Sequence, residues 1–190
     1  MTRPLFVEGD RVTLRVADDT EPALERGKNH PDVRRYVSVF RRPRRSDSTD
    51  STDDDPWTVI VPRGADTPDD PVGSVSLAPI QQVDGYANLG VWLSPDAWGH
   101  GYAVDACAHM IDYGFRELAL HRVSATAMTP NEPSIGMLDR LGFVHEGTAR
   151  EAQFADGEHV DAERYGLLRG EWEGPEAVLD ADSHPSGTGG

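Results

Sequence analysis

The stretch VWLSPDAWGHGYAVDA, residues 91–106, decides how the rest of this sequence is interpreted. Its apolar start is typical of a strand, Pro95 ends that strand, and Gly99 and Gly101 form a tight turn directly before a helical pattern. Two glycines in such a turn let the backbone approach a ligand closely and point successive N–H groups toward it. The first N–H groups of the helix add partial positive charge. The stretch therefore predicts a site for an anion, with a pyrophosphate as its natural occupant, that needs no lysine.

Two other interpretations compete for this stretch. Two glycines also occur in plain strand–turn–helix connections. The dinucleotide fingerprint G-x-G-x-x-G fails here because Val104 stands where its third glycine belongs. The strand before the turn also follows a predicted antiparallel hairpin, rather than opening a βαβ unit.

The segments on either side of the turn predict an α+β chain, with one largely antiparallel sheet of six to seven strands and about four helices. Alternating or continuous apolar runs predict the strands, and apolar residues at helical spacing predict the helices. The expected strands lie at 11–16, 57–61, 72–77, 86–93, 122–128, 145–154 and 159–168. The expected helices lie at 18–28, 31–37, 103–118 and 133–141.

The length of 190 residues suits one domain, which we place at residues 1–170. Residues 41–56 join an arginine-rich run to Ser, Thr and Asp residues without apolar periodicity, so we expect a mobile loop. Its arginines also suit a nucleic-acid patch or a partner-docking arm, but the adjoining carboxylates favour a solvated, locally neutralised loop. Residues 171–190 are acidic and then Gly/Ser-rich, which predicts a flexible tail.

The charge composition is strongly acidic, with 33 acidic against 18 basic residues, a formal net charge of −15 and Lys28 as the only lysine. A surface of carboxylates with little lysine is typical of proteins that remain soluble in concentrated salt, where screening weakens self-repulsion. We therefore expect a salt-adapted cytoplasmic protein, the alternative being an ordinary acidic one. The same charge argues against nucleic-acid binding. No apolar run reaches the length of a membrane span, and residues 1–14 lack signal-peptide features.

The single cysteine, Cys107, excludes an internal disulfide and a thiolate zinc site, and no metal site is predicted. Because Cys107 falls on the apolar face of a predicted helix, we interpret it as a packing residue and not as a nucleophile.

The turn and two later elements together resemble the GNAT superfamily of N-acetyltransferases, and in particular its RimJ/RimL-like branch. Residues 98–103, WGHGYA, are similar to the superfamily motif Q/R-x-x-G-x-G/A, with Trp98 in place of Gln or Arg, as is common in that branch. Residues 131–143 match its N-x-x-S-x-x-x-L-x-x-x-G-F element, and residues 146–168 resemble its closing hairpin. The resemblance runs from about residue 11 to 168 and is strongest from 89 onward.

This resemblance implies acetyl-CoA as cosubstrate, bound where the strands at 86–93 and 122–128 lie parallel and splay apart. It implies an N-acetyltransferase in which a primary amine attacks the thioester directly in a ternary complex. Backbone groups of one strand would hold the pantetheine and the turn amides the pyrophosphate, and an amide near Trp92 or Leu93 would stabilise the oxyanion. The implied cofactor-binding residues are Val91, Trp92, Leu93, Trp98, Gly99, His100, Gly101, Tyr102, Ala103, Asn131 and Ser134.

Two residues are the catalytic candidates. The resemblance puts Ser134 where a hydroxyl can reach the CoA sulfur, so Ser134 is expected to protonate the departing thiolate. Leu138 stands where many relatives carry a tyrosine acid, which leaves this step to Ser134 or to water, or makes it slow. The alternative is that the Ser134 hydroxyl only satisfies the first helical turn, with Asn131 as a simple N-cap. Glu151 is the candidate base, acting through water, because the resemblance puts Asn88 where some relatives have a glutamate. The alternative for Glu151 is a solvated strand carboxylate.

The acceptor follows from the resemblance only as a class, a primary amine on a protein N-terminus or on a small molecule. The resemblance is also compatible with a homodimer. A second hypothesis, a non-catalytic acyl-CoA-binding module of the same fold, remains open because Asn88 and Leu138 replace two acid–base positions.

Overall fold

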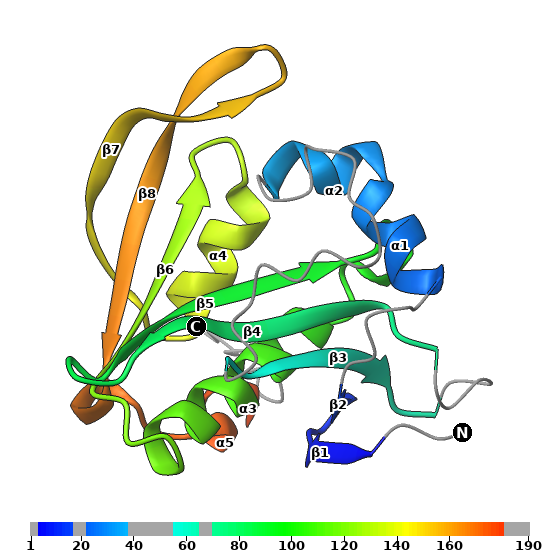
Figure 1. Ribbon diagram of the computed structural model, residues 1–190, viewed down its shortest axis with the longest axis vertical. Coiled ribbons are helices and arrows are strands. Elements are labelled where there is room, and N and C mark those ends of the chain that lie inside the picture. Colours follow the sequence, from blue (N-terminus) through cyan, green and yellow to red (C-terminus); the bar gives the residue numbers. More distant parts are fainter. Residues whose placement is uncertain (1–3, 17–21, 38–54, 65–69, 181–190) are drawn as a thin grey trace, which may run out of the picture.

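The computed structural model describes residues 4–16, 22–37, 55–64 and 70–180. These residues form one eight-stranded sheet in the order β1-β2-β3-β4-β5-β6-β8-β7, with helices on both faces (Figure 1). Every neighbouring pair of strands is antiparallel except β5 with β6. The predicted α+β class with one largely antiparallel sheet is confirmed, although the sheet has eight strands instead of six to seven.

The element bounds agree closely with the predicted segments in the second half of the chain. The strands are β1 (Leu5–Glu8), β2 (Val12–Val16), β3 (Trp57–Pro62), β4 (Gly73–Gln81), β5 (Tyr86–Leu93), β6 (Arg122–Met128), β7 (Val144–Ala155) and β8 (Glu158–Leu168). The helices are α1 (Pro22–Asn29), α2 (Pro31–Tyr36), α3 (Tyr102–Arg116), α4 (Glu132–Arg140) and α5 (Pro175–Leu179). The two elements that were not predicted are β1 and α5.

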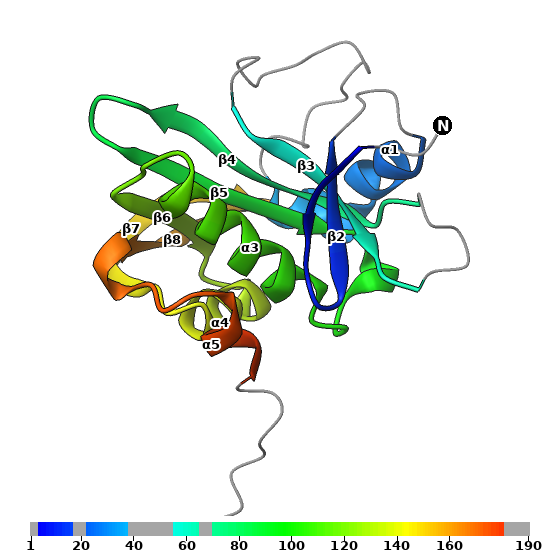
Figure 2. The same cartoon turned by 90° about the horizontal axis from the view of Figure 1, so that it is seen from below.

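The helices divide between the two faces of the sheet, as Figure 2 shows, with α3, α4 and α5 on one side and α1 on the other. The larger apolar cluster fills the α3 face and includes the fully buried Met110, Ile111 and Phe115. A smaller cluster on the opposite face joins Leu24 of α1 and Val33 of α2 to Trp92 of β5. Both clusters include side chains of β5, so apolar packing holds this strand on both faces of the sheet.

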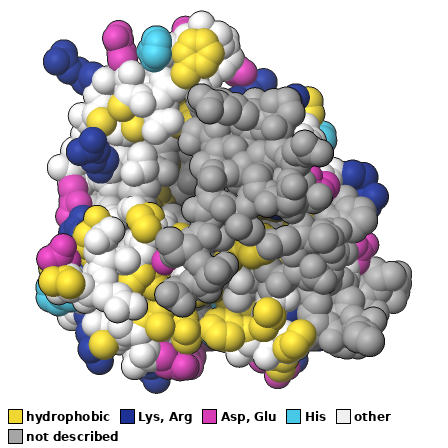
Figure 3. Space-filling view, in the orientation of Figure 1, with side chains coloured by type: hydrophobic (Ala, Val, Ile, Leu, Met, Phe, Trp, Pro, Cys, Tyr) yellow, Lys and Arg dark blue, Asp and Glu magenta, His cyan; other side chains and the backbone are white. Residues whose placement is uncertain are grey.

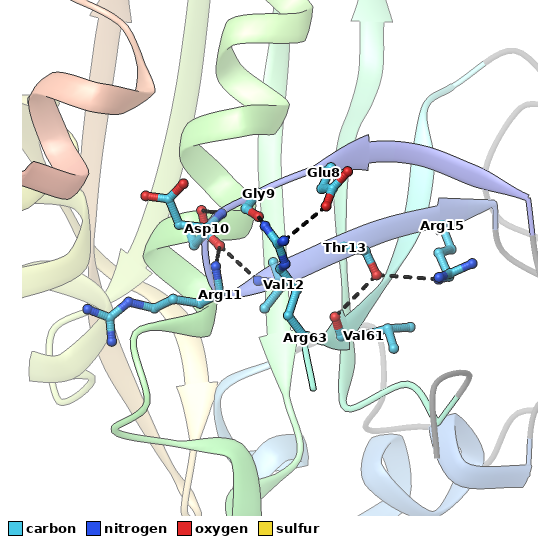
Figure 4. Close-up of polar contacts among 10 residues, drawn as sticks. Glu8, Gly9, Asp10, Arg11, Val12, Thr13, Arg15, Val61 and Arg63 are labelled. Atoms are coloured by element: carbon cyan, nitrogen blue, oxygen red, sulfur yellow. Dashed lines mark hydrogen bonds and ion pairs between the residues drawn. The ribbon is translucent and has the colours of Figure 1, made fainter. Parts of the chain in front are cut away.

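The turn between β1 and β2 is fastened to α3 by a buried carboxylate (Figure 4). Asp105 is fully buried, and its Oδ2 accepts the backbone N–H groups of Arg11 at 2.7 Å and Val12 at 2.9 Å. Its Oδ1 accepts the N–H of Asp10 at 3.3 Å and lies 3.3 Å from His109 Nε2 as an ion pair. Four groups therefore compensate the buried charge.

The segment after β8 differs from the predicted flexible tail as far as residue 180. Trp172 packs against the main apolar cluster, and its Nε1–H donates to Asp112 Oδ1 at 3.1 Å. The following helix α5 lies against α3. Burial of the indole supplies the apolar contact that the composition of this segment did not suggest. The predicted loop at 41–56 lies outside the described residues, apart from its last two, as do residues 181–190.

The described surface carries mixed charge where Figure 3 shows it. Basic and acidic side chains alternate along the left edge of that view, where β7 lies. Among the helices that the structure describes, none is both long enough and apolar enough to cross a bilayer.

Candidate functional site

The parallel pair β5 and β6 opens into a wedge. Their pairing covers only Tyr86–Asn88 against Arg122–Ser124, although both strands continue past that point. Beyond it β5 stays paired with β4 as far as Leu93, and β6 stays paired with β8 as far as Met128. Because each strand follows its antiparallel neighbour, the two separate, as the sequence analysis expected. Ser124 Oγ donates to Asn88 Oδ1 at 2.6 Å where the wedge begins.

The glycine turn closes the wide end of this wedge. Gly99 and Gly101 have φ values of 78° and 76°, the left-handed region that favours glycine. Gly101 is the N-cap of α3 and offers no side-chain cap. The first N–H groups of α3 have no partner within the helix, so they are available to an anion, and the helix dipole favours negative charge there. The predicted anion turn is thus present in its expected backbone form.

Two side chains brace the turn. Arg11 packs against Gly101, since a Cβ atom at Gly101 would lie 3.3 Å from Arg11 Nη1. The same Nη1 donates to the carbonyl oxygen of His100 at 3.3 Å. Trp98, which is 47% exposed, donates its Nε1–H to the carbonyl oxygen of Leu93 at 3.0 Å and so ties the turn to the end of β5. A guanidinium therefore lies beside an anion turn that contains no basic side chain apart from His100.

The start of α4 forms the other wall. Asn131 is its N-cap, and its side chain accepts the backbone N–H of Ser134 at 3.4 Å. This is the capping role that the sequence analysis gave as the simple interpretation of Asn131. Ser134 lies in the first turn of the helix, and both residues line the same cavity as the glycine turn.

One cavity of about 420 Å³ occupies the open end of the wedge. Every predicted cofactor-binding residue lines it except His100, which lines a neighbouring cavity of about 630 Å³. The residues that line the first cavity are Asp32, Val33, Tyr36, Val37, Val91, Trp92, Leu93, Ala97, Trp98, Gly99, Gly101, Tyr102, Ala103, Val104, Asn131, Pro133, Ser134 and Met137.

Four of these lining residues come from α2 and its C-cap and were not predicted as site residues. They are Asp32, Val33, Tyr36 and Val37. The sequence predicts the helix itself, but no local signal shows which element α2 will face. The hydroxyl of Tyr36 donates to the carbonyl oxygen of Pro130 at 3.4 Å and links α2 to the loop before α4.

The predicted base, Glu151, does not lie among the residues that line the cavity. It is an exposed residue of β7 with φ 51°, and its backbone N–H donates to Asp161 Oδ1 at 2.7 Å. Leu138 is 2% exposed and packs in the core. Burial raises the pKa of the Cys107 thiol far above its ordinary value, which suits the packing role given to it.

The family follows from comparison with known proteins. The profile of the acetyltransferase (GNAT) domain matches residues 11–144. The chain belongs to this family. GNAT acetyltransferases use acetyl-CoA, the cosubstrate that the sequence analysis expected, and the predicted enzyme type is that of the family.

Named relatives share about half of this chain. YdaF of Bacillus subtilis, provisionally named a ribosomal N-acetyltransferase, is 40% identical over 102 residues, which are 54% of this chain and 56% of YdaF. Spermidine N(1)-acetyltransferase of Vibrio cholerae is 27% identical over 101 residues, 53% of this chain and 58% of that protein. The matched stretch thus spans little more than half of each relative.

Solved structures share the GNAT-domain fold over most of the chain. A GCN5-related N-acetyltransferase from Brucella melitensis has a TM-score of 0.73 at 20% identity and covers 97% of this chain and 87% of its own. Spermidine N-acetyltransferase from Vibrio cholerae in complex with CoA and spermine has a TM-score of 0.72 at 21% identity, with 85% of this chain and 97% of its own covered.

Proposed function

We propose that this protein is an acetyl-CoA-dependent N-acetyltransferase that moves an acetyl group to a primary amine by direct attack in a ternary complex. The observation that carries the proposal is one cavity that unites the splayed end of β5, the glycine turn and the start of α4. The starts of α3 and α4 line one part of this cavity and α2 lines another, which suits a thioester and an amine bound side by side.

The chain offers backbone groups for each part of acetyl-CoA. The edge of β5 that faces away from β4, from Val91 to Leu93, suits the pantetheine amides, and the N–H groups of Gly99 to Ala103 suit the pyrophosphate. An amide N–H near Trp92 or Leu93 would stabilise the oxyanion, an effect worth about 3 kcal/mol per donor in related acyl transfer.

The reaction forms one bond and breaks one. The amine nitrogen attacks the thioester carbonyl, the tetrahedral intermediate collapses, and the C–S bond breaks with release of the CoA thiolate. The hydroxyl of Ser134 would donate the proton that the thiolate takes up. The nitrogen loses its proton to water, with Glu151 as the more distant base.

The role of Glu151 has a direct test, because this carboxylate lies outside the cavity lining. In Glu151→Gln, a lower kcat/KM that recovers as the pH is raised supports a base acting through water. An unchanged pH profile removes Glu151 from the mechanism and leaves the proton to solvent.

We also propose that the chain belongs to the RimJ/RimL-like branch and acts on the α-amine of a protein N-terminus. The WGHGYA form of the turn and the similarity to YdaF support this assignment. Acetylation of peptides at their α-amine, measured by mass spectrometry, tests this assignment. Modification of lysine side chains alone would contradict it. The acidic, lysine-poor composition supports a salt-adapted cytoplasmic protein.

The second candidate, a non-catalytic acyl-CoA-binding module, is favoured by the environment of two side chains. Asn88 carries no titratable group and is hydrogen-bonded to Ser124, and Leu138 is buried. Release of CoA thiol in the presence of a panel of primary amines separates the candidates. Amine-dependent release supports the enzyme, and tight acetyl-CoA binding without release by any amine supports the module.

A further inference from the structure

The amine side of the cavity is formed by one face of α2. Asp32, Val33 and Tyr36 fall on neighbouring positions of the same helical face, and Val37, the C-cap residue of α2, follows directly. Val33 is buried and packs with Trp92 of β5, which fixes this face toward the wedge. In Figure 1, α2 lies across from β6 and α4, on the side opposite α3.

Asp32 is the one carboxylate that lines the cavity among the described residues. Its side chain is 50% exposed, so a ligand can reach it. The neighbouring lining residues are Val33 and Tyr36 of α2 and the C-cap residue Val37, and the hydroxyl of Tyr36 already donates to Pro130. The acceptor side of the cavity therefore presents one negative charge in apolar surroundings.

Asp32 has a close histidine neighbour, His30. His30 Nδ1 lies 3.7 Å from Asp32 Oδ2, but the same Nδ1 accepts the backbone N–H of Asp32 at 3.3 Å. Because Nδ1 of His30 accepts this N–H and the Asp32 side chain is half exposed, the carboxylate remains accessible to a ligand.

We infer that Asp32 receives the ammonium group of the acceptor and that the acceptor is a monocationic amine on an apolar body rather than a polyamine. Among the described residues that line the cavity no second carboxylate is present, so a second ammonium bound there would have no carboxylate partner, and an unpaired charge is costly to bury. This inference rests on the proposed function and narrows its substrate class.

The experiment compares n-pentylamine with 1,5-diaminopentane, which share chain length and differ by one charge. Wild-type protein is expected to use the monoamine with the higher kcat/KM. Asp32→Asn should raise KM for the monoamine roughly tenfold with little change in kcat, as the loss of one charge-assisted contact predicts. Glu25→Gln is the matched control, because it removes the same charge from α1 outside the cavity.

Three outcomes overturn the inference while leaving the acetyltransferase intact: equal or better use of the diamine, an unchanged KM in Asp32→Asn, and an equal loss in Glu25→Gln. If the wild type transfers acetyl to no amine, the proposed function fails. In that case, calorimetric titration of the CoA-loaded protein with n-pentylamine tests whether Asp32 binds the ammonium group. Weaker binding by Asp32→Asn than by wild type supports the inference, and equal binding or none overturns it.

Discussion

Asp105 Oδ2 accepts the backbone N–H of Arg11 at 2.7 Å, so one buried side chain of α3 holds the turn that positions Arg11 beside the anion site. The carboxylate lies four residues after Gly101 and one helical turn before His109. The anchoring of the β1–β2 turn and the geometry of the glycine turn are therefore linked through a single residue, and this link has measurable consequences.

Removal of the Asp105 carboxylate should destabilise the fold. Asp105→Ala leaves three backbone N–H groups without their acceptor in a buried site, which is expected to cost about 3 kcal/mol. Urea unfolding measures the loss as a lower midpoint at unchanged slope. Glu117→Gln, an exposed position at the end of the same helix, is the control and should change the midpoint little. Equal stability of Asp105→Ala and wild type would contradict the role given to this residue.

The Asp105–His109 pair predicts a pH window of maximal stability. Burial alone would raise the pKa of Asp105, but His109 and the N–H groups of Arg11 and Val12 outweigh it and lower the pKa below its ordinary 3.8. Contact with Asp105 raises the pKa of His109 above its ordinary 6.5, although burial opposes this. The Asp105 contribution is therefore lost as the pH falls below 3.8 toward the folded-state pKa. The His109 contribution is complete below pH 6.5 and is lost as the pH rises through the folded-state pKa.

Unfolding free energies measured between acidic and alkaline pH test this window. The difference between wild type and His109→Gln should be largest between the two ordinary pKa values and should shrink toward alkaline pH. A difference that does not depend on pH would show that the pKa of His109 is the same in the folded and unfolded protein, which contradicts the raised pKa.

Replacement of Ser134 should affect chemistry and spare binding. If its hydroxyl protonates the departing thiolate, Ser134→Ala lowers kcat about a hundredfold. Its backbone N–H still bonds the Asn131 cap, so α4 and the affinity for acetyl-CoA should remain. Steady-state rates and calorimetry on the same preparation separate the two effects. An unchanged kcat in Ser134→Ala would show that the hydroxyl has no catalytic role and that Ser134 is only a residue of the first helical turn.

Salt should stabilise the protein if its composition is an adaptation. With a formal charge of −15, self-repulsion is strong in dilute buffer and is screened by salt. The thermal unfolding midpoint is expected to rise as potassium chloride increases to molar concentration. Highest stability in dilute buffer would reject the adaptation.

The elements that the sequence predicts best are those whose ends are marked by residues close by in the sequence. The bounds of β5 and β6 agree with the prediction, because Pro95 ends the first apolar run and Leu120 and His121 separate the second from α3. Gly142 follows α4 with φ 83°, the left-handed conformation that ends many helices.

The elements that the sequence does not predict depend on distant partners. Strand β1 has four residues, and Phe6 stacks edge-on against Tyr113 of α3 at 4.8 Å. Helix α5 has five residues and follows Trp172, which packs against the main apolar cluster. Asp32 looks like an ordinary residue of a helical first turn, and only the position of α2 across the wedge brings it to the cavity.

Calorimetric titration with acetyl-CoA tests the central claim, that the glycine turn at the end of the wedge binds this cosubstrate. The titration uses wild type, Gly101→Trp and Gly136→Ala, all in molar potassium chloride. Gly101 has φ 76° and lies against Arg11, whereas Gly136 has open space around its Cα. We predict saturable binding by wild type and by Gly136→Ala, and none by folded Gly101→Trp. No binding by folded wild type, or equal binding by Gly101→Trp, would contradict the claim.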